Sequence, residues 1–310
     1  MIGAITVFMQ SRTAFRVTES VSRLQENARF VLDTLEPDIR MASFFGLTSR
    51  SNKIQGRASS TEPTPPGLNV GNDCGVNWTL SVAEEVTGTN NGYGWACAAF
   101  GNSPQATADT FVLRRAAESP LTQPPEAGTL YLQTARFQDS QLFVGPALPA
   151  GFEPTTSQTH RFIVNGYYVS TTSSLDTPGN NVPSLRAKTL IGGALGPRII
   201  DQEVLPGVED FQLQFGIDTD LVGTAGRGSV DRYVNPDDPL IDPLDAAFDP
   251  DVTILAVRIW IRLRAQRPEN GFVDTNNYVY ADQNVPAPND QFRRAVVSKT
   301  IYLRNARTPS

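Results

Sequence analysis

Apolar side chains recur at alternating spacings of four and three residues over residues 17–35. This spacing places them on one side of an α-helix, while the charged residues between them fall on the other side. The apolar stripe consists of Val17, Val21, Leu24, Ala28, Val31 and Leu35. The pattern predicts one long amphipathic helix whose stripe is buried against the rest of the protein.

Three features bear on the limits of this helix. Pro37 lacks a backbone donor and presses on the carbonyl of Asp33, so we expect a kink or a break there. Gly46 supplies a stop further on. Upstream, the apolar stretch MIGAITVFMQ (residues 1–10) is continuous with the helical pattern and has about half of the roughly 20 residues that span a bilayer. It fits an ordinary buried helix start or the end of a longer membrane segment.

Beyond Gly46 the pattern changes to short runs in which apolar and polar residues alternate, with Pro, Gly, Asn and Asp clusters between them. A period of two is typical of half-buried strands, which we expect at 109–116, 129–137, 211–217, 253–265 and 293–305. In HRFIVNGYYVSTT (160–172), Asn165 and Gly166 suit a two-residue hairpin turn. The alternative is a single strand with a bulge at Gly166.

These elements predict an α+β protein. Its N-terminal helix, residues 1–45, would pack on the mainly antiparallel sheet of a β-rich globular head, residues 46–310. Long loop insertions are expected at 47–110 and 218–251, where turn-forming residues are dense.

Composition narrows the range of functions. The net charge is -6 and the pI is near 5.0, whereas binding to nucleic acid needs a clustered basic surface, so no nucleic-acid partner is expected. His160 is the single histidine and no GxSxG motif occurs, which argues against nucleophilic catalysis. We therefore expect no enzyme activity.

The two cysteines, Cys74 and Cys97, lie in a Gly/Asn-rich stretch. A structural zinc site usually takes four Cys or His ligands, and these cysteines lack such partners. The sequence favours a disulfide between them, with two free thiols as the alternative.

Three carboxylates form the candidate metal site. Asp218 and Asp220 are two residues apart, and Asp231 follows a Gly-rich loop that can fold back toward them. Oxygen ligands on a flexible loop are what Ca²⁺ selects, so calcium is the candidate ligand and no other cofactor is expected. The alternatives are a solvated acidic turn and a pair of acids for glycoside hydrolysis.

Several segments of the chain resemble the PilW-type minor pilins of bacterial type IV pili. The helical segment contains Leu-Gln-Glu-Asn-x-Arg-Phe followed by Asp-x-Arg-Met-Ala, and the last strand ends in Leu-Arg-Asn. The matching stretches are SRLQENARFVLDTLEPDIRMASFFG (22–46), PGVEDFQLQFGIDTD (206–220), SVDRYV (229–234), LAVRIWIRLRAQRPE (255–269) and FRRAVVSKTIYLRNAR (292–307). Residues 47–200 match loosely, and Leu47 stands where many relatives have a cysteine.

The resemblance implies a pilin-like form of this fold and a structural function. Such a subunit joins other minor pilins, the major pilin and a tip adhesin in a complex that primes pilus assembly and lies at or near the pilus tip, serving cell adhesion and twitching motility. Before assembly its head is periplasmic and its helix is anchored in the inner membrane. Relatives begin with a basic leader and an apolar half-helix containing a glutamate, so the resemblance implies that MIGAITVFMQ is the last part of a truncated membrane segment.

Two other functions fit the same observations. A minor pseudopilin of type II secretion would share the helix and the sheet. A secreted carbohydrate-binding or hydrolytic β-protein would instead need a cleft lined by aromatic side chains.

Overall fold

The computed structural model describes residues 2–48, 50–84 and 86–306. The side chains of residues 1–14 and 16 lie outside the described part, and these include the stretch MIGAITVFMQ. The helical elements are α1 (Ile2–Arg40) and the short 3₁₀ turns η1 (Ser51–Lys53) and η2 (Phe100–Asn102). The strands are β1 (Ile54–Gln55), β2 (Val86–Thr89), β3 (Thr110–Ala116), β4 (Leu130–Ala135), β5 (Ser140–Val144), β6 (Ser157–Ser170), β7 (Ser184–Ile191), β8 (Arg198–Pro206), β9 (Val208–Asp218), β10 (Arg232–Val234), β11 (Thr253–Arg264), β12 (Tyr278–Tyr280), β13 (Gln283–Val285) and β14 (Arg294–Tyr302).

The predicted α+β class with one sheet is wrong, because the described chain is mostly β and its strands divide among three sheets. An eight-stranded sheet has the order β1-β5-β4-β6-β3-β2, with β7 and β8 added beside the second half of β6. A four-stranded sheet has the order β10-β9-β11-β14, and β12 and β13 form a separate hairpin. Pairing is antiparallel except between β1 and β5. Alternation of polar and apolar residues predicts strands, but it does not say which sheet each strand joins.

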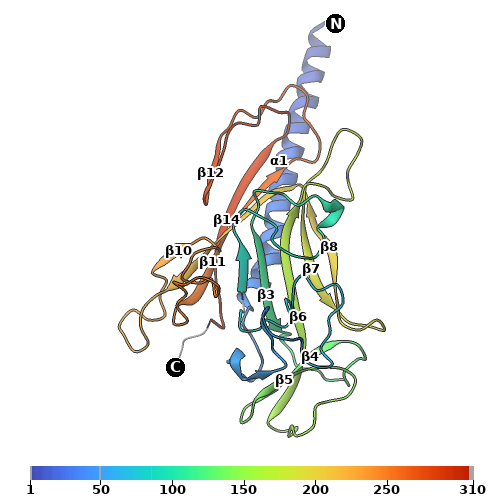
Figure 1. The fold of residues 1–310 in the computed structure, drawn as a ribbon. Coiled ribbons are helices and arrows are strands. Elements are labelled where there is room, and N and C mark those ends of the chain that lie inside the picture. The colour runs from blue at the N-terminus through green and yellow to red at the C-terminus, as the bar shows by residue number, and fades with distance from the viewer. Residues whose placement is uncertain (1, 49, 85, 307–310) are drawn as a thin grey trace.

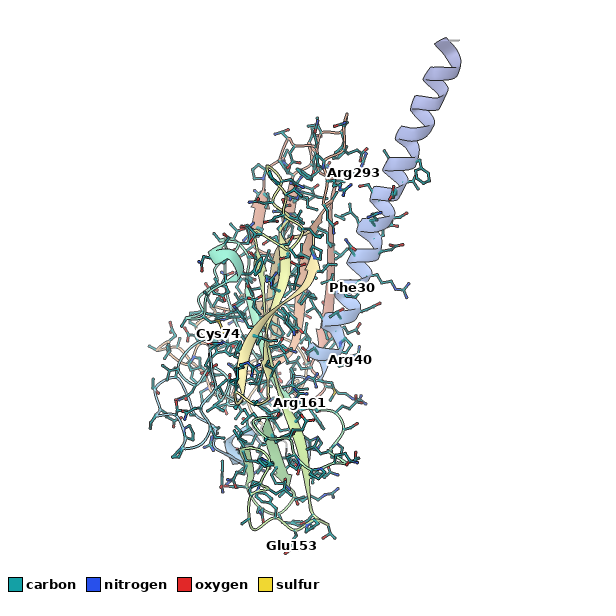
Figure 2. All side chains as sticks on the ribbon, turned by 90° about the vertical axis from the view of Figure 1, so that its right-hand side faces the viewer. Phe30, Arg40, Cys74, Glu153, Arg161 and Arg293 are labelled. Atoms are coloured by element: carbon teal, nitrogen blue, oxygen red, sulfur yellow. A yellow bond between two sulfur atoms is a disulfide. The ribbon has the colours of Figure 1, made fainter. Side chains whose placement is uncertain are left out.

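Helix α1 stands beside both large sheets, and its N-terminal part projects well beyond them (Figure 1). The view turned by 90° shows the same projection (Figure 2). The C-terminal part packs against β14, β11 and β8. At about 1.5 Å per residue, 39 residues give a helix of roughly 58 Å, so the globular part covers only a portion of it.

A break at Pro37, one of the two expected outcomes there, is wrong, and so is the expected stop at Gly46, because α1 ends at Arg40. Pro37 lies inside α1, which continues to Arg40, and the Pro37 carbonyl still accepts a hydrogen bond from Met41 N at 3.1 Å. The proline removes the one hydrogen bond that its N–H would donate to the Asp33 carbonyl. The chain then reverses at Ser43, whose φ is 66°, before it reaches Gly46.

The first hydrophobic core lies between the two large sheets and α1. The helix contributes Leu24, Ala28, Val31, Leu35 and Ile39. The facing strands contribute Phe111 and Leu113 of β3, Leu185 of β7, Phe211, Leu213 and Phe215 of β9, and Val257, Ile259 and Ile261 of β11. The strands predicted at 109–116, 211–217 and 253–265 therefore meet in one core.

A second core covers the opposite face of the eight-stranded sheet. Val112, Leu132 and Phe162 point away from the first core and pack with Leu80 and Ile54 from the segments before β2. The long insertion at 47–110 is thus the cover of this face, and the eight-stranded sheet is buried on both sides.

The hairpin expected at Asn165 and Gly166 is wrong, because β6 runs unbroken through both residues. Its first half pairs with β4, and its second half pairs with β3 on one side and β7 on the other, with no register shift at Gly166. A Cβ at Gly166 would lie 2.8 Å from the Trp78 ring and 2.9 Å from the Trp95 ring. The glycine is needed because two aromatic rings press on the strand there.

Candidate functional site

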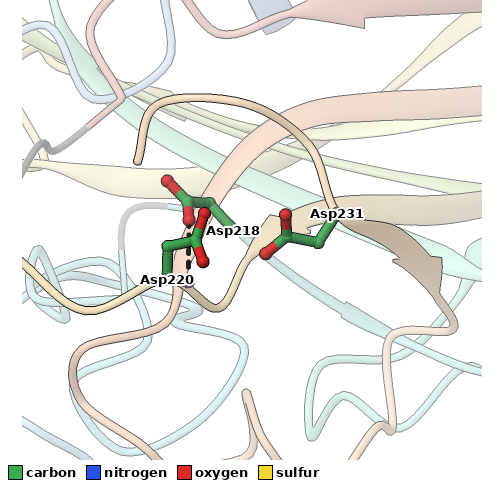
Figure 3. Close-up of side chains that lie close together, drawn as sticks. All are labelled: Asp218, Asp220 and Asp231. Atoms are coloured by element: carbon green, nitrogen blue, oxygen red, sulfur yellow. Dashed lines mark hydrogen bonds between the residues drawn. The ribbon is translucent and has the colours of Figure 1, made fainter. Parts of the chain in front are cut away.

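The predicted acidic residues meet where β9 ends and β10 begins. Ile217 pairs with Arg232 across the two strands, which brings Asp218 beside Asp231, and Asp220 follows at the start of the connecting loop. One ligand oxygen from each of the three carboxylates lies within 4.8 Å of the others (Figure 3). Asp218 is buried, Asp220 is half-buried and Asp231 is exposed, so the group lies at the surface with one deep member.

Hydrogen bonds from the loop hold two of these carboxylates in place. Asp218 accepts from the backbone N–H of Asp220 at 3.0 Å, the dashed line in Figure 3, and from that of Gly228 at 2.6 Å. Asp231 accepts from both the backbone N–H and the hydroxyl of Thr219, at 2.7 and 2.8 Å. The backbone bond and then the hydroxyl bond lower the pKa of Asp231, so it stays ionised at neutral pH.

Arg227 supplies a positive charge to the same loop. Its Nη1 lies 3.6 Å from Asp218 Oδ1 and donates to the Asp220 carbonyl, while its Nη2 donates to the Asp251 carbonyl and the Thr253 hydroxyl at 2.9 Å. The arginine offsets part of the repulsion among the carboxylates. Any bound cation would therefore have to compete with it.

The glycines of this loop are required by its shape. Gly226 has a φ of 107°, and a Cβ there would lie 2.2 Å from Asp220 Oδ2. Backbone with such positive φ values favours glycine. The arrangement can hold a hard cation through carboxylate and carbonyl oxygens, and it can also stand as an acidic turn that Arg227 closes.

Cys74 and Cys97 form a disulfide that closes a loop with a sequence separation of 23 residues. This loop carries Trp78 and Trp95, whose ring centroids are 5.6 Å apart where they cover Gly166 of β6. The disulfide therefore fixes an aromatic cover on the eight-stranded sheet.

The predicted helix stripe divides into two parts. Leu24, Ala28, Val31 and Leu35 are buried in the first core. Val17 is half-buried and Val21 is 38% exposed, so the N-terminal part of the stripe is only partly covered. The helical period identifies the correct face but not how much of it the sheets cover.

Asp38 is a structural residue that the sequence analysis missed. It lies in the last turn of α1, is 7% exposed, and accepts hydrogen bonds from Arg115 Nε, Asn165 Nδ2 and Tyr167 Oη, each at 2.7 Å. Burial, and then the Asp38 carboxylate, raise the pKa of Tyr167 well above its usual value of 10. The available signal was its spacing, because Asp38 lies three residues after Leu35 and so takes the next position of the apolar stripe.

His160 is a buried residue of β6. Its Nδ1 lies 2.8 Å from the Ala117 carbonyl and its Nε2 lies 3.4 Å from Gln158 Oε1. Burial lowers the pKa of His160, so it is neutral at physiological pH. Its position is that of a packed core side chain.

Comparison with known proteins points to one class. A family model of type IV pilus assembly matches residues 166–305, from the middle of β6 to just past β14, which is less than half of the chain, and this match supports a type IV pilus-related role. The family is the type IV pilus-assembly protein W, PilW, which confirms the resemblance drawn from the sequence. The match covers the whole four-stranded sheet and part of the eight-stranded sheet, and it includes the acidic loop between β9 and β10.

Comparisons with curated proteins and with solved structures give less information about the family than the family model does. No curated protein matches the chain. Among solved structures, a type IV-like pilin from Thermus thermophilus is similar at 16% sequence identity and a TM-score of 0.30, covering 66% of this chain and 82% of that chain. A similarity of this size does not bear on the function of the chain.

Within the described residues, no helix combines the length and the apolar character needed to cross a membrane.

Proposed function

We propose that this protein is a minor pilin, a low-abundance structural subunit that joins other pilus components in the complex that primes type IV pilus assembly. The PilW match over residues 166–305 carries this proposal. The match includes β7, β9 and β11, which together with β3 form the core against α1, so the helix packs on strands of the matched region.

The projecting part of α1 supports a role in assembly. Phe15 lies on this part and is 72% exposed, and Phe30 is exposed on the side of α1 away from the core. Covering large apolar side chains that are exposed to water lowers the free energy, and so stabilises the contact with the covering surface. We propose that neighbouring subunits supply that cover.

The proposed partners are other minor pilins, the major pilin and a tip adhesin. The proposed location is the inner membrane with a periplasmic head before assembly, and afterwards the pilus at or near its tip. We retain residues 1–45 as the assembly helix and residues 46–310 as the head, and we propose no catalytic activity.

Cross-linking in the native bacterium tests this function. A photo-reactive amino acid replaces Phe15, and the cross-linked products are identified by mass spectrometry. We expect products with minor or major pilins, and none from the matched control in which the same group replaces Val279, an exposed residue of β12. Cross-links to secretion-system pseudopilins would support the alternative function in type II secretion. Products from Val279 alone would contradict the role proposed for α1.

A further inference from the structure

A surface pocket lies at the end of the molecule opposite the N-terminus of α1. It has a volume of about 370 Å³ and is formed by Leu47, by Arg136 and Phe137 after β4, and by residues 154–158 at the start of β6. Glu153, the neighbour of this last segment, marks that end in Figure 2. The size lies within the range of small-ligand sites in proteins.

The β-sheet fixes the two main walls of the pocket relative to each other. Ala135 pairs with Ser157 at the end of the β4–β6 ladder, and Arg136 N donates to the Thr156 carbonyl at 3.2 Å. The Ser157 hydroxyl donates to the Glu153 carbonyl at 2.7 Å, which ties the turn before β6 to the strand. Ser157 and Gln158 of the pocket therefore stand in β6, and the Arg136 backbone is hydrogen-bonded to the turn that carries Thr155 and Thr156.

The lining favours an anion that also carries hydroxyl groups. Arg136 is exposed and lines the pocket with no carboxylate beside it in the lining. No ion pair among the described residues involves its guanidinium. A free guanidinium binds a carboxylate through two parallel hydrogen bonds. Thr155, Thr156 and the side-chain amide of Gln158 add donors and acceptors around it.

An aromatic ring gives the pocket an apolar wall. Phe137 is 86% exposed, and Leu47 and Pro154 lie in the same lining. An exposed ring of this kind can cover the apolar face of a sugar ring, a contact that a small inorganic anion would not use.

We propose that this pocket binds a sugar residue that carries a carboxylate, with Arg136 holding the carboxylate and Phe137 stacking on the ring. The lining contains no carboxyl group to act as acid or nucleophile, so the pocket binds sugar without cleaving it. This ligand goes beyond the proposed function, because a subunit that only builds a filament needs no sugar site. Its position away from the projecting helix leaves the pocket open when α1 is covered.

Titration of the purified full chain with D-glucuronate, followed by amide NMR spectra, tests the proposal. We expect saturable shifts confined to the residues around 136–137 and 154–158. D-glucose should bind about tenfold more weakly, since it lacks the carboxylate that a charged hydrogen bond would hold. Acetate should bind more weakly than glucuronate, because it lacks the ring that Phe137 covers. Equal binding of acetate and glucuronate would overturn the assignment of a sugar ligand.

Variants separate the two contacts. Arg136→Gln should weaken glucuronate binding about tenfold and remove the preference over glucose, and Phe137→Ala should weaken both sugars. Arg161→Gln is the control: Arg161 is also exposed, but it lies in β6 outside the lining of the pocket, so this change should leave binding unchanged. Unchanged binding in Arg136→Gln, or the absence of saturable shifts at millimolar glucuronate, would overturn the proposal. Because these assays use purified protein, their failure would leave the role in pilus assembly standing.

Discussion

The Asp38 carboxylate lies 2.7 Å from the Arg115 guanidinium, and this ion pair joins the last turn of α1 to β3. Carboxylates are disfavoured near the C-terminal end of a helix, where the helix dipole is negative. Hydrogen bonds from three donors of the eight-stranded sheet, Arg115, Asn165 and Tyr167, offset this unfavourable position of the Asp38 carboxylate. Together they set the position of the helix against the sheet.

Replacing Asp38 with alanine should lower the free energy of unfolding by about 3 kcal/mol, because Arg115 would be left as a largely buried cation without its partner. Urea denaturation followed by tryptophan fluorescence measures the loss. Asp33→Ala is the matched control on the same helix, since Asp33 forms an exposed pair with Arg29 that should be worth less than about 1 kcal/mol. Equal losses in the two variants would contradict the structural role of Asp38.

The two ends of the apolar stripe should respond differently to the same substitution. Val31→Asp places a carboxylate in the core, where Val31 is 0% exposed, and should unfold the domain; Leu24→Asp should do the same. Val21→Asp, at a position 38% exposed, and Glu26→Ala, off the stripe, should leave it folded. Circular dichroism and melting temperature report the result. Tolerance of Val31→Asp would show that α1 is not packed as described.

The buried part of the helix was predictable because periodicity depends only on local sequence. Val31 and Leu35 lie where the stripe places them, whereas the exposure of Val21 depends on where the sheets end, which the helical sequence does not encode. Gly166 shows the same limit. An Asn-Gly pair between β-rich runs is a turn signal, yet here two tryptophans from a distant loop press on the glycine and the strand continues.

The division into sheets and the key polar contacts depend on long-range pairing. β6 joins three neighbours, and nothing in its alternation reveals this. The spacing places Asp38 on the buried side of the helix, but the helical sequence does not reveal which donors from the sheet it meets. The approach of Asp218 and Asp231 was predictable, because both flank a glycine-rich connection between two adjacent strands, but the insertion of Arg227 was not.

Asp109 should make stability depend on pH. It is buried between β3 and β9, where its two oxygens accept the backbone N–H groups of Asn91 and Leu213 at 2.8 Å. Burial above all, with the nearby charges of Asp282 and Asp210, raises the pKa of Asp109 from 3.8 to about 7. Because the pKa of Asp109 is higher in the folded protein than in the unfolded chain, protonation of Asp109 stabilises the fold. This contribution to the free energy of unfolding is complete below pH 3.8 and is lost as the pH rises through 7. It amounts to at most about 4 kcal/mol.

Denaturant midpoints on both sides of pH 7, for the unaltered protein and for Asp109→Asn, test this dependence. The difference in stability between the two proteins should change with pH, because the variant has no proton to lose at this position. A difference that stays constant across this range would show that Asp109 keeps an ordinary pKa.

Calcium binding by Asp218, Asp220 and Asp231 remains a prediction. Isothermal titration should show weak binding, on the order of 10⁻⁴ to 10⁻³ M, together with a rise in melting temperature. Asp220→Asn should abolish both effects, whereas Arg227→Gln should strengthen binding by removing the competing cation. No heat and no change in melting temperature for either the unaltered protein or Arg227→Gln would mean that the three residues form an acidic turn closed by Arg227.

The central claim is a role in building type IV pili, and deletion of the gene in the native bacterium tests it most directly. Pili sheared from the cell surface are quantified by immunoblot of the major pilin, alongside the level of type II secretion. The account predicts few or no surface pili with normal secretion, and recovery of pili by the unaltered gene but not by one encoding Val31→Asp. Normal pili in the deletion strain, with or without a loss of secretion, would contradict it.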